Sequence, residues 1–137
     1  MSSGDRLARL QDIPLFAGLD RAALERLVEA STEIDVAAGH VLIRADDPGS
    51  GMFVLEEGTV VVESPRVTLE LGPGEFFGEL SLLVPDAKRA ARVRAATPVR
   101  CVALDRATLE AMLDEEPGFA LDMLRVVAQR LAKVTRG

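Results

Sequence analysis

The residues best suited to chemistry lie in the stretch from Gly72 to Ala95, GPGEFFGELSLLVPDAKRAARVRA. Gly78 can adopt backbone angles that other residues avoid, and it lets a ligand approach the main chain closely. The residues after it read as one helical turn, whose free N–H groups and positive dipole end suit an anion. Arg89 adds a planar, two-pronged donor for phosphate oxygens, and Glu79 adds an acceptor for hydroxyl groups. A sugar phosphate satisfies both demands, so the sequence predicts a site for such a ligand.

This stretch resembles the phosphate-binding cassette of cyclic nucleotide-binding domains. The family pattern has F-G-E-L-[AS]-L, then R-[AST]-A, then V-R-A. This chain has FGELSL at 77–82, RAA at 89–91 and VRA at 93–95. The spacing from Gly78 to Arg89 is similar to that of the bacterial catabolite-activator branch of the family.

The resemblance implies a role for each residue of the pattern. Glu79 would hold the ribose 2′-hydroxyl and Arg89 the cyclic phosphate, while N–H groups around Gly78, Leu80 and Ala90 would complete the site. On the last helix, Arg130 lies where relatives place an arginine that reaches toward the nucleotide. The candidate ligand-binding residues are Gly78, Glu79, Leu80, Ser81, Arg89, Ala90, Val62 and Arg130.

Each of these features also has a purely structural interpretation. A glutamate at a helix start often only complements the dipole, a single arginine in a loop is usually solvated, and Gly72-Pro73-Gly74 is typical of a hairpin turn. Their joint occurrence at this spacing favours the ligand site. Gly72, Gly74 and Gly78 do not form a dinucleotide fingerprint, because the third glycine comes one residue late and no parallel strand–helix alternation surrounds it.

The sequence carries no recognisable catalytic frame, and we expect no enzyme. His40 is the single histidine. A cupin-type metal site is therefore excluded, because it needs two or three histidines, and a Ser-His-Asp triad would have to use His40. There is no G-x-S-x-G elbow and no P-loop. Cys101 alternates in a strand pattern and is expected to be packed rather than reactive.

The composition indicates one globular domain of 137 residues, with 48% hydrophobic residues and 28% charged residues. The net charge of −6 argues against general nucleic-acid binding, which needs a basic face. The single cysteine excludes an internal disulfide. With no signal-like N-terminus and no long apolar run, we expect a cytoplasmic protein with no membrane segment.

Helical periodicity flanks a central region of strand periodicity. The sequence predicts a short helix over 3–12, with Asp5 as a candidate cap, and a second helix, Arg21–Ala30, capped by Asp20. From Thr32 the period changes to two, and short strands alternate with turns at near-regular spacing until Leu104. This favours an α+β fold with an antiparallel sandwich or barrel. The family resemblance implies a β-roll of about eight strands with a short cassette helix over part of 76–91.

The C-terminal part predicts two helices. Asp105 should cap a helix over 106–115, Pro117-Gly118 should break the chain, and a last helix should run from about 119 to 134. One apolar stripe is expected on this helix, made of Ala120, Met123, Leu124, Val127, Leu131 and Val134. Such a stripe is most often core. The resemblance adds two compatible uses: a lid over the base, or a homodimer through the last helix.

Together these features predict a single domain over 1–137, with N-terminal helices to residue 30, a β-roll over 31–104, and hinge and lid helices over 105–135. We expect a cAMP sensor or regulatory module without a fused output, with Leu80 and Leu113 as hinge candidates. Its other partner would be an unknown downstream protein. DNA is not expected as a partner, because too few residues follow the last helix for a DNA-reading helix.

The preference for cAMP over cGMP rests on Ala90, where a hydroxyl looks favourable for guanine in the family. Val134 departs from the threonine that relatives use for the adenine amine, so base discrimination is open and cGMP remains an alternative. Three other functions stay open as well. They are a ligand-independent interaction scaffold, the truncated sensory half of a transcription regulator, and a sensor for another effector such as a cyclic dinucleotide or haem.

Overall fold

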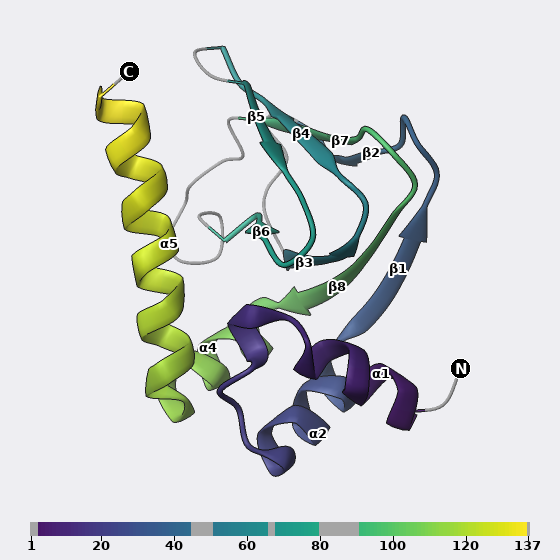
Figure 1. Cartoon of the computed structure of the whole chain (residues 1–137), viewed down its shortest axis with the longest axis vertical. Helices are drawn as coiled ribbons and strands as arrows, with labels where there is room; N and C mark the ends of the chain where they lie inside the picture. Colours follow the sequence, from purple (N-terminus) through teal and green to yellow (C-terminus); the bar gives the residue numbers. More distant parts are fainter. Residues whose placement is uncertain (1–2, 45–50, 66–67, 80–90, 137) are drawn as a thin grey trace.

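Helices at both ends of the chain flank a series of β-strands in the computed structural model, which describes residues 3–44, 51–65, 68–79 and 91–136 (Figure 1). The N-terminal helices are α1 (Ser3–Gln11), the 3-10 turn η1 (Pro14–Phe16) and α2 (Arg21–Ala30). The strands are β1 (Thr32–Val36), β2 (Val41–Ile43), β3 (Gly51–Glu57), β4 (Val60–Glu63), β5 (Thr68–Leu71), β6 (Phe76–Phe77), β7 (Arg92–Ala95) and β8 (Val99–Asp105). The chain continues into α4 (Arg106–Glu115) and α5 (Pro117–Arg136).

The strands form two four-stranded sheets, in the orders β1-β8-β3-β6 and β2-β7-β4-β5. Every strand pairing within them is antiparallel. Figure 1 shows the sheets curving around each other, with α1 and α2 below them and the long helix α5 standing along one side. The predicted α+β fold with an antiparallel β-roll is confirmed. The predicted cassette helix lies outside the described residues.

Side-chain alternation on the central strands divides the core in two. On β3, Met52 and Val54 belong to a cluster shared with the helices, whereas Leu55 belongs to a second cluster inside the roll. Cys101 on β8 also lies in this second cluster. Burial raises the pKa of its thiol to about 12, so Cys101 is a packed residue, as its strand position predicts.

Two aspartates fix the helix starts as predicted. The Asp20 carboxylate accepts a hydrogen bond of 2.8 Å from the Ala23 N–H at the start of α2. The Asp105 carboxylate accepts one of 2.8 Å from the Thr108 N–H at the start of α4. Each satisfies a donor that the first helical turn leaves free. Asp5 was a wrong cap candidate, because α1 begins at Ser3 and Asp5 lies within its first turn.

The structure corrects the predicted C-terminal helix in two ways. The predicted break between the two helices lies at Glu116, and Pro117 and Gly118 already belong to α5, since the fixed φ of proline suits the first helical position. The expected apolar stripe is also divided between two faces. Met123 is buried and Val127 packs against the core, whereas Leu124 and Leu131 are 64% and 62% exposed. None of the helices that the structure describes is long and apolar enough to cross a membrane.

Candidate ligand-binding site

The short strand β6 positions the start of the predicted cassette. Phe76 pairs with Val54 and Phe77 with Phe53 on β3, and the Phe77 ring stacks on the Phe53 ring with 5.1 Å between centroids. Both β6 phenylalanines are buried. Gly78 follows with a φ of 90°, a backbone conformation that favours glycine. The chain therefore turns sharply at Gly78, immediately before Glu79, as the sequence predicts.

Glu79 is a buried acid, with 6% of its surface exposed. Burying a carboxylate is costly unless charged or hydrogen-bonding groups surround it. The Arg130 guanidinium supplies such a group from α5, with Nη1 donating to Glu79 Oε1 at 3.4 Å. These two predicted site residues are 51 positions apart in the sequence, and the fold brings them together.

Arg130 also holds α5 against β6. Its Nη2 donates a hydrogen bond of 2.6 Å to the Phe76 carbonyl oxygen, and its guanidinium carbon lies 4.6 Å from the centre of the Phe76 ring. The first contact satisfies a main-chain acceptor, and the second is a cation–π interaction. One side chain of the last helix thus contacts both the strand that begins the site and the acid that follows it.

The remaining site candidates are only partly placed. Leu80, Ser81, Arg89 and Ala90 lie outside the described residues. Val62 lies on β4, opposite Leu69 on one side and Val93 on the other, and packs against the cluster inside the roll. It therefore sits in the other sheet from β6. Of the hinge candidates, Leu113 packs against the helix-side core and Leu80 is among the undescribed residues.

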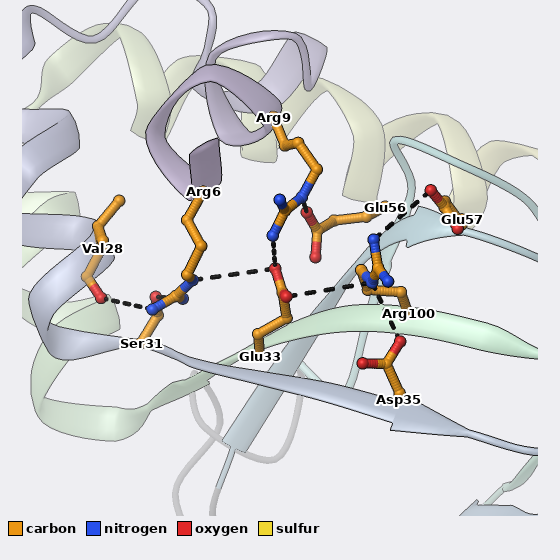
Figure 2. Close-up of polar contacts among 9 residues, drawn as sticks. All are labelled: Arg6, Arg9, Val28, Ser31, Glu33, Asp35, Glu56, Glu57 and Arg100. Atoms are coloured by element: carbon orange, nitrogen blue, oxygen red, sulfur yellow. Dashed lines mark hydrogen bonds and ion pairs between the residues drawn. The ribbon is translucent and has the colours of Figure 1, made fainter. Parts of the chain in front are cut away.

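Two features of the structure were missed from the sequence. The first is the contact of Arg130 with the ring and the carbonyl oxygen of Phe76. The available sequence signal was the combination of an arginine on the last helix with the Phe-Phe-Gly-Glu segment. The second is an arginine–carboxylate cluster where α1 meets the roll (Figure 2). No sequence signal singled it out, because its members come from four separate elements. They are Arg6, Arg9, Glu33, Asp35, Glu56, Glu57 and Arg100.

The described part of the site has the chemistry of a binding site rather than a catalytic centre. Glu79 can accept hydrogen bonds from hydroxyl groups, Arg130 carries a permanent positive charge, and Gly78 has no side chain. Among the described residues, no group of His, Cys, Asp and Glu could hold a metal ion. His40 is exposed and lies at the start of β2, in the other sheet from β6.

Comparison with known proteins identifies relatives over most of the chain. A family model described as "cyclic nucleotide-binding domain" matches residues 33–116. A cyclic nucleotide-gated potassium channel of Mesorhizobium japonicum is 40% identical over 108 residues, which are 79% of this chain and 30% of the channel. The chain spans less than two thirds of the length of the first curated relatives that it matches.

Solved structures agree with the family match. A mutant of a cAMP-binding acyltransferase from Mycobacterium smegmatis superposes with a TM-score of 0.82 at 34% identity, covering 96% of this chain and 42% of the acyltransferase. The N-terminal domain of a transcriptional regulator from Streptomyces coelicolor gives a TM-score of 0.66 at 35% identity, covering 94% of this chain and 96% of that domain.

Proposed function

The chain belongs to the cyclic nucleotide-binding domain family, and we propose that it binds cAMP in preference to cGMP and acts as a sensor or regulatory module. The observation that carries the proposal is the buried carboxylate of Glu79, which follows the positive-φ Gly78 and contacts Arg130 of the last helix. A buried acceptor beside a glycine, which has no side chain, and an arginine suits a ligand with both hydroxyl and anionic groups.

The proposed roles follow the family pattern. Glu79 accepts a hydrogen bond from the ribose 2′-hydroxyl, and Arg89 binds the cyclic phosphate with its paired donors. The N–H groups around Gly78, Leu80 and Ala90 complete the phosphate site. Ser81 and Val62 line the ligand, and Arg130 faces it from α5.

A signal can leave the site through Arg130, because this side chain joins Glu79 to the last helix. A nucleotide that hydrogen-bonds to Glu79 changes the partners available to Arg130. Nucleotide binding and the position of α5 are therefore coupled. A ligand shifts that equilibrium only through its different affinity for the two positions of the helix. An unidentified downstream protein would read the change.

The preference for cAMP has two supports. Ala90 lacks the hydroxyl that looks favourable for guanine in this family. The acyltransferase that superposes at 34% identity is described as cAMP-binding. Val134 stands where relatives have a threonine for the adenine amine, so the preference over cGMP should be smaller than in those relatives.

A ligand-independent scaffold is the second candidate. A regulatory subunit of a cAMP-independent protein kinase A from Trypanosoma brucei superposes with a TM-score of 0.77 at 28% identity, covering 93% of this chain and 47% of that one. The fold therefore occurs in a protein that does not depend on cAMP. The match to the Streptomyces regulator domain keeps the sensory half of a transcription regulator as a third candidate.

Calorimetric titration with cAMP and then cGMP tests the proposal, using Arg89→Ala as the site variant. Removing one partner of a hydrogen-bonded charge pair should weaken cAMP binding by about 2–5 kcal/mol, which is roughly 30-fold to several thousand-fold. Arg92→Ala is the matched control, because Arg92 is a nearby arginine whose described partner is Glu63. A loss below about tenfold for Arg89→Ala would remove its assigned role. No heat with either nucleotide would favour the scaffold.

A further inference from the structure

The arginine–carboxylate cluster lies between α1 and the outer face of the sheet β1-β8-β3 (Figure 2). Arg6 and Arg9 come from α1, Glu33 and Asp35 from β1, Glu56 and Glu57 from β3, and Arg100 from β8. Met52 and Val54 form the apolar part of the β3 face that meets the helices, and Glu56 is the next residue on this face. At this point the contact between helix and sheet changes from apolar to ionic.

One guanidinium holds two carboxyl groups in the cluster. Arg9 Nη2 donates to Glu33 Oε2, and Arg9 Nε donates to Glu56 Oε1 at 3.2 Å. Glu33 has further cations nearby, with Arg6 Nε 3.8 Å from Oε2 and Arg100 Nε 4.0 Å from Oε1. Glu33 is therefore surrounded by positive charge, whereas the described ion pair of Glu56 is with Arg9 alone.

A β-bulge accounts for the unusual position of Glu56. The register of β3 against β8 shifts between Leu55 and Glu57, which leaves Glu56 as the extra residue. Bulges re-aim side chains, and here the Glu56 side chain is directed under α1, where only 4% of its surface is exposed. Within the described part of the chain, its Oε2 atom is buried without a hydrogen-bond partner.

An unpartnered buried carboxylate oxygen is unfavourable if Glu56 is ionised, because nothing replaces the water it has lost. A proton on that oxygen converts it into a donor, and the Glu33 carboxylate is the acceptor beside it. We propose that Glu56 and Glu33 share one proton and that this carboxyl pair, bridged by Arg9, is a pH-sensitive latch that fastens α1 to the β-roll.

The surrounding charges are consistent with a neutral Glu56. Three cations, Arg6, Arg9 and Arg100, face the pair, and Glu33, Asp35 and Glu57 supply three anions to match them. Asp12 lies near Arg9 and Glu56 but is exposed to solvent. Pro73 and Gly74 of the β5–β6 turn border the same cleft and do not titrate. Cys101 of β8 packs inside the roll, and burial raises the pKa of its thiol to about 12, so the thiol stays protonated.

The pKa values of the two acids move apart. Burial, then the hydrogen bond with Glu33, raises the pKa of Glu56, and these effects outweigh the opposing one of Arg9. The pKa of Glu33 is lowered: burial opposes this, but the hydrogen bonds with Arg9 and Glu56 and the nearby arginine charges prevail. Such divergence is expected when two acids share a proton, and the pair titrates as a unit.

The sign of the pH effect follows from these directions. A raised pKa of Glu56 gives stability that is present at low pH and is lost as the pH rises through the folded-state value. A lowered pKa of Glu33 gives stability that is lost as the pH falls through its folded-state value. The latch is therefore tightest between the two titrations and loosens when Glu56 ionises.

The test is an NMR titration of the side-chain carboxyl carbons of the full chain, labelled with carbon-13 in glutamate. We expect the Glu56 signal to titrate above the ordinary value of a glutamate and, in Glu33→Gln, to fall because the neighbouring anion is gone. A Glu56 midpoint at or below that of the exposed Glu57 in the wild-type protein would overturn the proposal. This comparison uses only the wild-type protein, so it does not depend on whether a variant folds.

Unfolding measurements supply the second arm. Glu56→Gln keeps an acceptor for Arg9 and a permanent donor for Glu33, so it mimics the protonated acid at every pH. Its stability relative to wild type should grow as the pH rises from about 5 to about 8. The protection factors of the α1 amides, which correct for the intrinsic rise of exchange with pH, should fall over this range only in the wild type. Glu57→Gln, which removes a neighbouring but exposed charge, should show a constant difference. If the stability difference between Glu56→Gln and the wild type did not change with pH, the latch would be contradicted too.

Discussion

At the scale of single residues, the proposed ligand site depends on how a buried acid is used. Glu79 is held beside Arg130, whose Nη1 donates to Oε1 at 3.4 Å, and a carboxylate has several lone pairs that can accept from more than one donor. A ribose hydroxyl could therefore bind without displacing the arginine. Glu79 would then link the ligand to the last helix.

Glu79→Ala should weaken cAMP binding by about 1.5–3 kcal/mol, the usual contribution of a hydrogen bond to a charged group. The loss should come from the ribose, so 2′-deoxy-cAMP should bind the wild-type protein weakly and lose little further affinity in the variant. Calorimetry on the four combinations of protein and ligand measures the coupling. Equal affinity of the wild-type protein for both ligands would remove the ribose assignment.

Arg130 should contribute to stability even without ligand. Arg130→Ala removes the donor to the Phe76 carbonyl, the cation over the Phe76 ring and the contact with Glu79. We expect the free energy of unfolding to fall by about 1–3 kcal/mol in urea titrations. Arg130→Lys should recover only part of this, because an ammonium group cannot reproduce the planar donor pair.

Arg125→Ala is the matched control for Arg130. Arg125 lies on the same helix but is exposed, and its nearest acid, Asp122, is 3.8 Å away on the surface. Its loss should change stability by less than about 0.5 kcal/mol. If the two alanine variants were equally stable, the contacts of Arg130 with β6 would contribute nothing to the fold.

At the scale of elements, turns between strands hold the roll in register. Gly58 and Gly39 both have positive φ, at 87° and 89°. They differ in their surroundings: a Cβ at Gly58 would lie 2.2 Å from the Pro98 carbonyl oxygen, whereas nothing lies within 4 Å of one at Gly39. The β3–β4 turn is therefore packed against the segment before β8, whereas the β1–β2 turn leaves space for a side chain at Gly39.

Gly39→Ala should cost about 1–2 kcal/mol, the price of a left-handed conformation for a residue with a side chain. Gly58→Ala should cost clearly more, because the same backbone strain is joined by a clash with a main-chain atom that cannot rotate away. Chemical denaturation of both variants against the wild type gives the difference. A Gly58→Ala cost no greater than that of Gly39→Ala would show that the turn moves to accept the methyl group.

Elements with local signals were predictable, and elements that depend on distant partners were not. Asp20 and Asp105 fixed the starts of α2 and α4 because a cap acts on its own helix. The strand β6 was missed since its two residues are strand only through pairing with β3. The prediction of one apolar stripe on α5 was wrong, because periodicity does not say which side of a helix meets the core.

The candidate site shows the same limit. Gly78 and Glu79 were found from a motif of neighbouring residues, and Arg130 from a family resemblance. The contacts of Arg130 with Phe76 could not be predicted, since they require the packing of α5 on the roll. The ligand-binding roles of all the candidate residues remain predictions, and Leu80, Ser81, Arg89 and Ala90 also lie outside the described residues.

At the scale of the whole molecule, the large apolar side chains that are exposed among the described residues lie on α5. Leu121, Leu124 and Leu131 are 45%, 64% and 62% exposed, and they point away from the face that Phe119, Met123 and Arg130 present to the roll. Exposed leucines repeated along one helix are typical of a binding surface. A second copy of the chain, pairing helix to helix, is the occupant that we propose, because the same stripe would then bury itself.

Leu124→Glu combined with Leu131→Glu should therefore convert a dimer into a monomer, because each dimer would place four carboxylates in an apolar seam. Sedimentation velocity across a range of concentrations measures the change in mass. Gln129→Glu adds a charge to an exposed position of the same helix outside the leucine stripe, so it should leave association unchanged. A wild-type chain that stays monomeric at every concentration would exclude the dimer. Unchanged association of the double variant would place any dimer contact elsewhere on the molecule.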